Sequence, residues 1–157
     1  MARFEMEKSQ TADGSKIVST TGRLSSSYSE ASADTQNAIL IAQANVVAEQ
    51  QRKNAGDMLN LKGYGKGLTR EAIRVSSPFV RGGARGIKIA FFGTRNGGRT
   101  RAAEVAFFNE FGIGDNEGNV RMSKRLFISK ANESTADECA EIAADLFAAY
   151  VADQIQI

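Results

Sequence analysis

Residues 86–92 read Gly-Ile-Lys-Ile-Ala-Phe-Phe and form the most strand-like stretch of the chain. β-Branched and aromatic residues of this kind are enriched in β-strands. A glycine-rich turn, residues 82–86, comes directly before this stretch, and residues 72–80, with Ile73 and Val75, have the composition of another strand. Two such runs on either side of a glycine turn predict an antiparallel β-hairpin over residues 72–92.

The chain begins with a second hairpin pattern. Phe4 and Met6 alternate with charged residues, which is the period of a half-buried strand. Asp13-Gly14 is a dipeptide that tolerates the positive φ angles of a tight turn, and β-branched residues follow it in residues 16–21. We therefore expect a hairpin over residues 3–21, with a flexible N-terminal arm as the alternative.

Helical periodicity appears in four places. Residues 33–54 have a broad apolar face, and Ser32 or Asp34 is suited to cap the first turn. Residues 100–111 predict a short helix, and residues 125–131 predict a further helical turn. Residues 134–154 predict a second long helix, whose apolar stripe comprises Cys139, Ile142, Ala143, Leu146, Phe147 and Tyr150.

The order of these elements predicts an α+β fold, because strands and helices are segregated along the chain. We expect an antiparallel β-hairpin sheet packed against two long helices and one short helix, with an extra N-terminal β-hairpin. Residues 1–32 would form an N-terminal hairpin arm, and residues 33–157 would form a single domain. The predicted core joins both long helices to the central hairpin and comprises Ile39, Val46, Ile87, Ile89, Leu146 and Phe147.

The composition argues against catalysis, cofactors and metal binding. Among 157 residues there is no histidine, which removes the commonest general base and metal ligand, and there is only one cysteine, Cys139. The glycine-rich residues 63–67 lack the spacing of a phosphate-binding loop. Acidic pairs such as Asp137 with Glu141 are predicted to lie on a solvated helix face. No apolar run approaches the roughly 20 residues of a membrane helix, and the N-terminus carries acids where a signal peptide needs an apolar stretch.

The net charge of +2 conceals a strong segregation of charge along the chain. Residues 62–101 contain 10 basic side chains and one acidic side chain, Glu71, whereas residues 102–157 contain four basic and 10 acidic side chains. The basic block predicts a polyanion or an acidic protein surface as partner. Because the acidic block belongs to the same chain, copies of this chain are predicted to be complementary to one another.

Five arginines lie with glycines at and beyond the two turns that flank residues 86–92. Their planar guanidinium groups suit phosphate and carboxylate partners alike. The first hypothesis is contact with acids of an adjacent subunit, such as Glu104, Asp137, Glu141 or Asp145. The alternative is that the arginines face DNA phosphates, either on a channel wall or in a small nucleic-acid-binding protein that uses hairpin 81–101. The arginines are Arg81, Arg85, Arg95, Arg99 and Arg101.

Two short motifs occur in the C-terminal half. Residues 105–112 read Val-Ala-Phe-Phe-Asn-Glu-Phe-Gly, and residues 125–128 read Arg-Leu-Phe-Ile, with an alanine at 131. This ordered pair, followed by an amphipathic helix and preceded by a long helix and a β-hairpin, resembles a family of tailed-phage proteins that complete the tail or join it to the head. The family has proline where this chain has Leu126. The matching residues are Ala106, Glu110, Phe111, Gly112, Arg125, Phe127 and Ala131.

The resemblance implies a structural protein of the virion rather than an enzyme. Similar proteins form rings around the DNA channel, often of six subunits, in the neck or at the head-proximal end of the tail. The implied partners are further copies of the chain, other neck, connector and tail-tube proteins, and non-specific contact with genomic DNA. The implied location is the virion, after synthesis in the host cytoplasm, with no membrane partner.

The Glu110-Phe111-Gly112 motif leads to three local expectations. Phe111 should pack inward, and Gly112 should end the short helix with a positive φ angle. Glu110 should pair with a basic residue of this chain or of a neighbouring subunit. The alternative for Glu110 is that it caps or solvates the turn.

Overall fold

The computed structural model describes residues 3–58, 68–95, 100–114 and 117–155, and its centre is a five-stranded antiparallel sheet. The strand order is β1-β2-β5-β3, and β4 pairs with β5 beside β3. The strands are β1 (Arg3–Gln10), β2 (Lys16–Arg23), β3 (Ile73–Val75), β4 (Phe79–Arg81) and β5 (Ala84–Phe91).

Two long and three shorter helices accompany this sheet. The described helices are α1 (Ala33–Met58), α2 (Leu68–Ala72), α3 (Ala102–Phe111), α4 (Phe127–Ser134) and α5 (Ala136–Ile155), with a single 3-10 turn at Ser26–Tyr28. Two small hairpins complete the described structure: β6 (Thr94–Arg95) with β7 (Thr100–Arg101), and β8 (Ile113–Gly114) with β9 (Val120–Met122). None of the described helices is long and apolar enough to cross a membrane.

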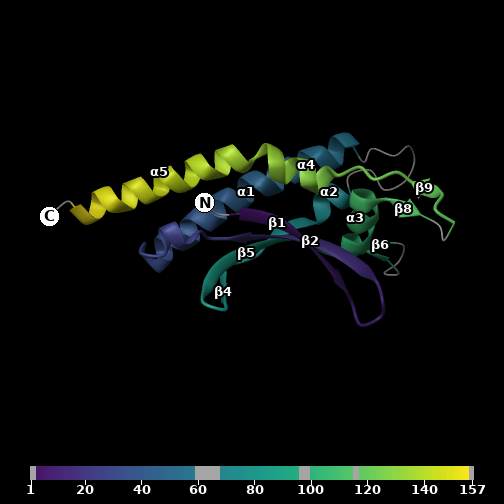
Figure 1. Cartoon of the computed structure of the whole chain (residues 1–157), viewed down its shortest axis with the longest axis horizontal. Helices are drawn as coiled ribbons and strands as arrows, with labels where there is room; N and C mark the ends of the chain where they lie inside the picture. Colours follow the sequence, from purple (N-terminus) through teal and green to yellow (C-terminus); the bar gives the residue numbers. More distant parts are fainter. Residues whose placement is uncertain (1–2, 59–67, 96–99, 115–116, 156–157) are drawn as a thin grey trace.

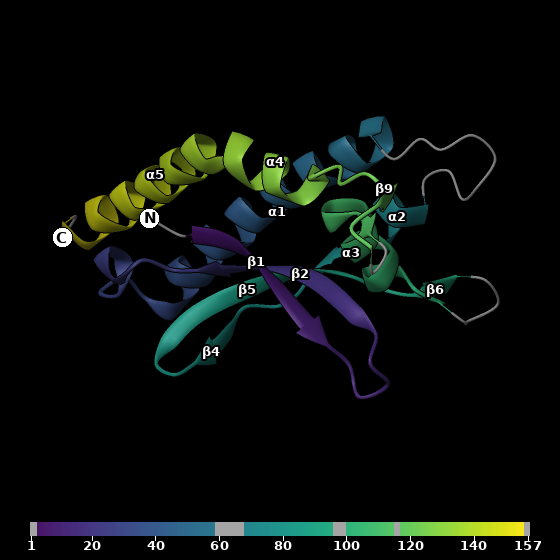
Figure 2. The same cartoon turned by 45° about the vertical axis from the view of Figure 1, so that its right-hand side comes forward.

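The molecule is layered, with α1 between the sheet and α5 (Figure 1). Helix α1 packs on β3 and β5, and α5 packs along α1 and α4. In both views the long helices lie on one side of the sheet, and within the described residues no helix covers its other side (Figures 1 and 2). The expected α+β class is therefore confirmed.

The N-terminal hairpin is an integral part of the sheet. Strand β2 pairs with β1 on one side and with β5 on the other, in a register that places Thr20 opposite Ile89 and Gly22 opposite Ile87. Val18 and Thr20 are only 1% exposed because they face the helices. The hairpin predicted over residues 3–21 is confirmed. The boundary expected after residue 32 does not separate it from the rest of the fold, because β2 and β5 belong to one sheet.

The strand expected from residue 72 to Val80 is interrupted. Ala72 ends α2, and β3 and β4 pair in succession with the same edge of β5, separated by Ser76-Ser77-Pro78. Proline has no N–H to donate, which breaks the ladder at this point. The Ser76 hydroxyl replaces part of the lost pairing by accepting a hydrogen bond from the Lys88 backbone N–H at 2.9 Å.

The core lies between the sheet and the first half of α5. Ile39, Ile87 and Ile89 are fully buried as predicted. The prediction was wrong for Leu146 and Phe147, which are half-buried, and Val46 is half-buried as well. The reason is that the second half of α5 extends past the sheet, where the Phe147 ring packs on Tyr28, with a centroid distance of 5.1 Å, and on Tyr150. The places of these side chains in the core are taken by Phe127 and Ile128 of α4.

Candidate functional site

The C-terminal end of α3 and the N-terminal end of α4 form one junction, and Glu110 is at its centre. The Glu110 side chain is 0% exposed. One carboxylate oxygen, Oε2, accepts a hydrogen bond from the Ile128 N–H at 2.7 Å, and the other, Oε1, accepts from the Ser129 N–H at 3.1 Å and from the Ser129 hydroxyl. A carboxylate placed here satisfies amide groups that would otherwise have no partner and is stabilised by the positive end of the helix dipole.

Two backbone hydrogen bonds and one side-chain bond hold the junction together. The Arg125 N–H donates to the Asn109 carbonyl at 2.9 Å, and the Leu126 N–H donates to the Glu110 carbonyl at 3.3 Å. The Arg125 guanidinium also donates to the Asn109 side-chain oxygen at 2.7 Å. Leu126 has a φ angle of +54°, which proline cannot adopt because its ring fixes φ near −65°. A proline at this position would therefore require another backbone conformation.

The three local expectations for the motif have different outcomes. Gly112 ends α3 with a φ angle of +77°, and its N–H donates to the Phe108 carbonyl at 2.7 Å, as predicted. Phe111 is half-buried against the core, and the Lys8 ammonium lies 4.8 Å from the centre of its ring. The ion pair expected for Glu110 is absent among the described residues, because backbone amides occupy its carboxylate. The capping alternative is the arrangement observed.

The remaining motif residues also belong to the interior. Ala106, Phe127 and Ala131 are each 0% exposed. The Phe127 ring lies edge-on to Phe91 of β5, with a centroid distance of 6.0 Å. The motif that carries the family resemblance is therefore a packing unit between α3, α4 and the sheet.

The described arginines of hairpin 81–101 lie near opposite ends of β5. Arg81 and Arg85 flank the β4–β5 turn, whereas Arg95 in β6 and Arg101 in β7 lie beyond the other end of the strand (Figure 2). Arg99 lies outside the described residues. The hairpin 81–101 therefore supplies two separate groups of arginines.

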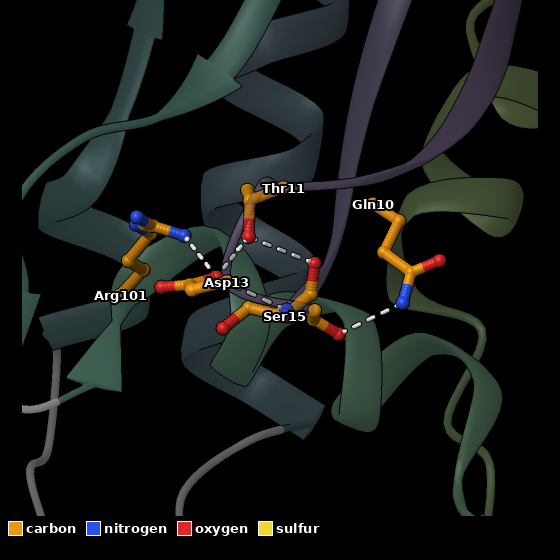
Figure 3. Close-up of polar contacts among 6 residues, drawn as sticks. Gln10, Thr11, Asp13, Ser15 and Arg101 are labelled. Carbon is orange, nitrogen blue, oxygen red and sulfur yellow. Dashed lines mark hydrogen bonds and ion pairs between the residues drawn. The ribbon is translucent and has the colours of Figure 1, made fainter.

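Arg101 has a partner within the chain, at the β1–β2 turn (Figure 3). Its guanidinium lies 3.3 Å from the Asp13 carboxylate. That carboxylate also accepts hydrogen bonds from the Thr11 hydroxyl and from the Ser15 N–H, the latter at 3.1 Å. The Thr11 hydroxyl above all, together with the Ser15 donors and the charge of Arg101, holds the pKa of Asp13 well below its usual range. Asp13-Gly14 thus forms the predicted turn, and Gly14 has a φ angle of +86°.

The uncovered side of the sheet contains a cleft of about 500 Å³, here called the sheet-face cleft. It lies beside the β4–β5 turn and is bounded by residues of β1, β2, β4 and β5. The charged residues that border it are Arg23, Arg81, Arg85, Lys88 and Glu7.

Each cation that borders the sheet-face cleft has a different environment. The Arg85 guanidinium donates to the side-chain oxygens of Gln36 at 3.2 Å and Asn37 at 3.0 Å in α1, so it lies on the covered side of the sheet, away from the cleft. Arg23 lies 3.5 Å from the Glu7 carboxylate. Arg81 is exposed and its guanidinium lies 5.9 Å from the centre of the Phe79 ring. Lys88 is exposed.

Three residues of the cleft were missed by sequence reasoning: Arg23, Lys88 and Thr21. The pairing of Thr21 with Lys88 and of Arg23 with Gly86 places them together on the uncovered face. A signal existed for Lys88, since a lysine between Ile87 and Ile89 in a strand must point away from the core. No local signal placed Arg23 and Thr21 beside it, because that depends on the pairing of two distant strands.

The predicted acidic partners lie mainly on α5. Asp137, Glu141 and Asp145 are exposed and recur every fourth residue, so they share one side of the helix. Helix α5 contains five acidic residues and no basic residue. Glu104 is half-buried in the first turn of α3. The acidic side of the molecule and the sheet-face cleft therefore belong to the two outer layers, on opposite sides of α1 and the sheet.

The chemistry available to the cleft is the binding of anions such as carboxylates and phosphates. Within the described ranges, no group of three or more acidic or cysteine side chains could hold a metal ion. Comparisons of the chain with protein-family models, with curated proteins and with solved structures give no match.

Proposed function

We propose that this chain is a structural virion protein of a tailed bacteriophage, forming a ring in the neck or at the head-proximal end of the tail. The observation that supports the proposal most directly is the junction at Glu110. Residues 105–112 and 125–131, which carry the resemblance to tail-completion and head–tail joining proteins, are separate in sequence but meet in one junction with Glu110 buried at its centre. The two motifs of the sequence are thus joined in the structure by the hydrogen bonds between Glu110 and the start of α4.

The distribution of charge supports assembly of the chain with itself. The acidic helix α5 and the sheet-face cleft lie on opposite sides of the molecule. When the acidic side of one subunit binds the cleft side of the next, the first and last subunits of the assembly still have one unoccupied side each. Contacts of this head-to-tail kind generate closed rings when the rotation between subunits closes.

The proposal is tested by measuring the mass of the purified, nuclease-treated chain in solution by analytical ultracentrifugation over a range of protein concentrations. Rotational averaging of electron micrographs of the same sample then reports ring symmetry. The expected result is a closed oligomer with a central channel in the absence of DNA. A monomer at every concentration and at low salt contradicts the proposal.

A second candidate function is a small nucleic-acid-binding protein, favoured by Arg23, Arg81 and Lys88 of the sheet-face cleft. It predicts a monomer that binds duplex DNA with an affinity that falls steeply with salt, because counterions are released from the phosphates on binding. The two candidates are therefore separated by the oligomeric state in the absence of DNA.

A further inference from the structure

We infer that the sheet-face cleft receives the acidic side of α5 from a second copy of this chain. This inference specifies the subunit contact of the proposed function and depends on it. Its receptor is the cleft whose cations are Arg23, Arg81 and Lys88, and its ligand is the row formed by Asp137, Glu141 and Asp145.

The cleft carries positive charge that the described chain does not neutralise. Of its three cations, Arg23, Arg81 and Lys88, only Arg23 has an ion pair with a carboxylate among the described residues. Arg85 also borders the cleft, but its guanidinium is bonded to Gln36 and Asn37 of α1, on the covered side of the sheet, and adds no charge to the cleft. Arg81 and Lys88, the cations of the cleft without an ion pair among the described residues, create a field around a cleft of about 500 Å³ that attracts an anionic partner.

An independent observation also indicates a missing partner in the cleft. Thr21 lines it and is only 6% exposed, yet its hydroxyl oxygen has no hydrogen-bond partner within the described structure. A buried hydroxyl without a partner is costly, since it loses its hydrogen bonds to water on folding. A carboxylate brought to this part of the cleft would supply the acceptor that the hydroxyl lacks.

The dimensions of the two surfaces agree. Asp137 and Asp145 are eight residues apart on a helix, which places them about 12 Å apart along its axis. On the receptor side, Arg81 pairs with Ala84, and Lys88 lies four residues further along β5, a span of about 13 Å along the strand. Both rows of charge are therefore about as long as each other, with Glu141 at the centre of the acidic row.

The composition of both surfaces favours a second copy over DNA as the occupant. Helix α5 has five acidic residues without one basic residue, so it is a concentrated source of carboxylates that needs cations from elsewhere. Glu7 lies within the cleft and is paired with Arg23, so the lining is of mixed charge and is no continuous basic track for a run of phosphates. A short row of three acids is better matched to this mixed lining than a DNA backbone.

The test is an exchange of charge between two variants. Variant one carries Arg81→Glu and Lys88→Glu, which reverses exposed cations of the cleft without touching Arg85 and its bonds to α1. Variant two carries Asp137→Lys and Glu141→Lys on α5. Each variant alone places like charges in the contact, and the dissociation constant of its assembly should rise by at least about 100-fold. A mixture of the two should assemble, because the acidic cleft of one accepts the basic helix of the other.

The control is a variant with Lys124→Glu and Lys130→Glu, which makes the same change in net charge as variant one at exposed positions outside the cleft. Unfolding curves of all variants establish that each is folded, and the control should assemble as the wild type does. Wild-type rings together with normal assembly of variants one and two overturn the inference and leave the proposed function standing. Variant one that assembles normally but no longer retains duplex DNA also overturns it and assigns the cleft to phosphate. A wild-type chain that stays monomeric contradicts the proposed function itself.

Discussion

The burial of Glu110 predicts that the charge of one carboxylate holds the α3–α4 junction together. The change to make is Glu110→Gln, which keeps the size of the side chain but removes its charge and replaces one acceptor oxygen with an NH2 group. The carboxylate accepts hydrogen bonds from the Ile128 N–H, the Ser129 N–H and the Ser129 hydroxyl. In the variant, the NH2 group must face at least one of these backbone donors, and that donor loses its partner in a buried place.

The magnitude follows from the number and kind of the bonds. A hydrogen bond to a charged group contributes about 1.5–3 kcal/mol, and an unsatisfied buried donor costs about 1–3 kcal/mol. Glu110→Gln should therefore lower the free energy of unfolding by about 2–4 kcal/mol, and Glu110→Ala, which also opens a cavity, by about 3–5 kcal/mol. The measurement is urea denaturation followed by circular dichroism, with the wild type under the same conditions.

Glu133→Gln is the matched control, because Glu133 is an exposed residue of α4. An exposed substitution of this kind should change the free energy of unfolding by less than about 0.5 kcal/mol. If Glu110→Gln were no more destabilising than this control, the carboxylate would not be holding the N-terminus of α4, and the structural explanation of the Glu-Phe-Gly motif would be wrong.

Three further predictions concern backbone, thiol and core. Leu126→Pro should lower the free energy of unfolding by about 3 kcal/mol or more, because proline cannot adopt a φ angle of +54° and lacks the N–H that is bonded to the Glu110 carbonyl. Leu126→Gly should leave the free energy of unfolding nearly unchanged, and thermal unfolding of both variants tests the difference. Burial raises the pKa of the Cys139 thiol to about 11, so iodoacetamide at pH 8 should alkylate the folded chain far more slowly than the urea-unfolded chain. Ile89→Ala should lower the free energy of unfolding by about 2–5 kcal/mol and Leu146→Ala by clearly less, since Leu146 is only half-buried; equal losses in urea denaturation would contradict the layering of α5.

The sequence was sufficient to predict the local elements, because each is specified by its own periodicity. Asp13-Gly14 and residues 82–86 predicted the two main turns, and both hairpins and both long helices are present. Residues whose role depends on another part of the chain were not predictable in this way. Gln51 is a polar residue on a helix, yet it is fully buried and its amide donates to Thr20 of β2 and to Asn132 of α4, at 3.0 Å in each case. Only the packing of α1 between the sheet and α4 explains its position.

The basic block shows why a count of charge along the chain was not enough to locate a surface. Arg85 and Arg95 are ten positions apart and belong to the same basic block, but an eight-residue strand, about 26 Å long, starts at Ala84 and carries the chain away from the first turn. Arg95 and Arg101 are therefore absent from the cleft, and Arg23 lies there instead because β2 pairs with β5. The expected attraction between basic and acidic parts of the chain therefore remains a proposal, now assigned to a particular set of residues.

Glu110 shows the same limit for a single residue. An acid inside an otherwise apolar motif suggested a cationic partner, since a buried charge must be compensated. The charge is compensated instead by backbone amides at the start of α4. Backbone amides are present at almost every residue, so the amino-acid sequence does not indicate which of them will be free to donate. Such amides become available only where a helix begins close to the carboxylate, and here that requires Leu126 in a left-handed conformation and Phe127 inserted in the core. The role of the acid thus depends on how the chain enters α4, which explains why two motifs separated in sequence form one structural unit.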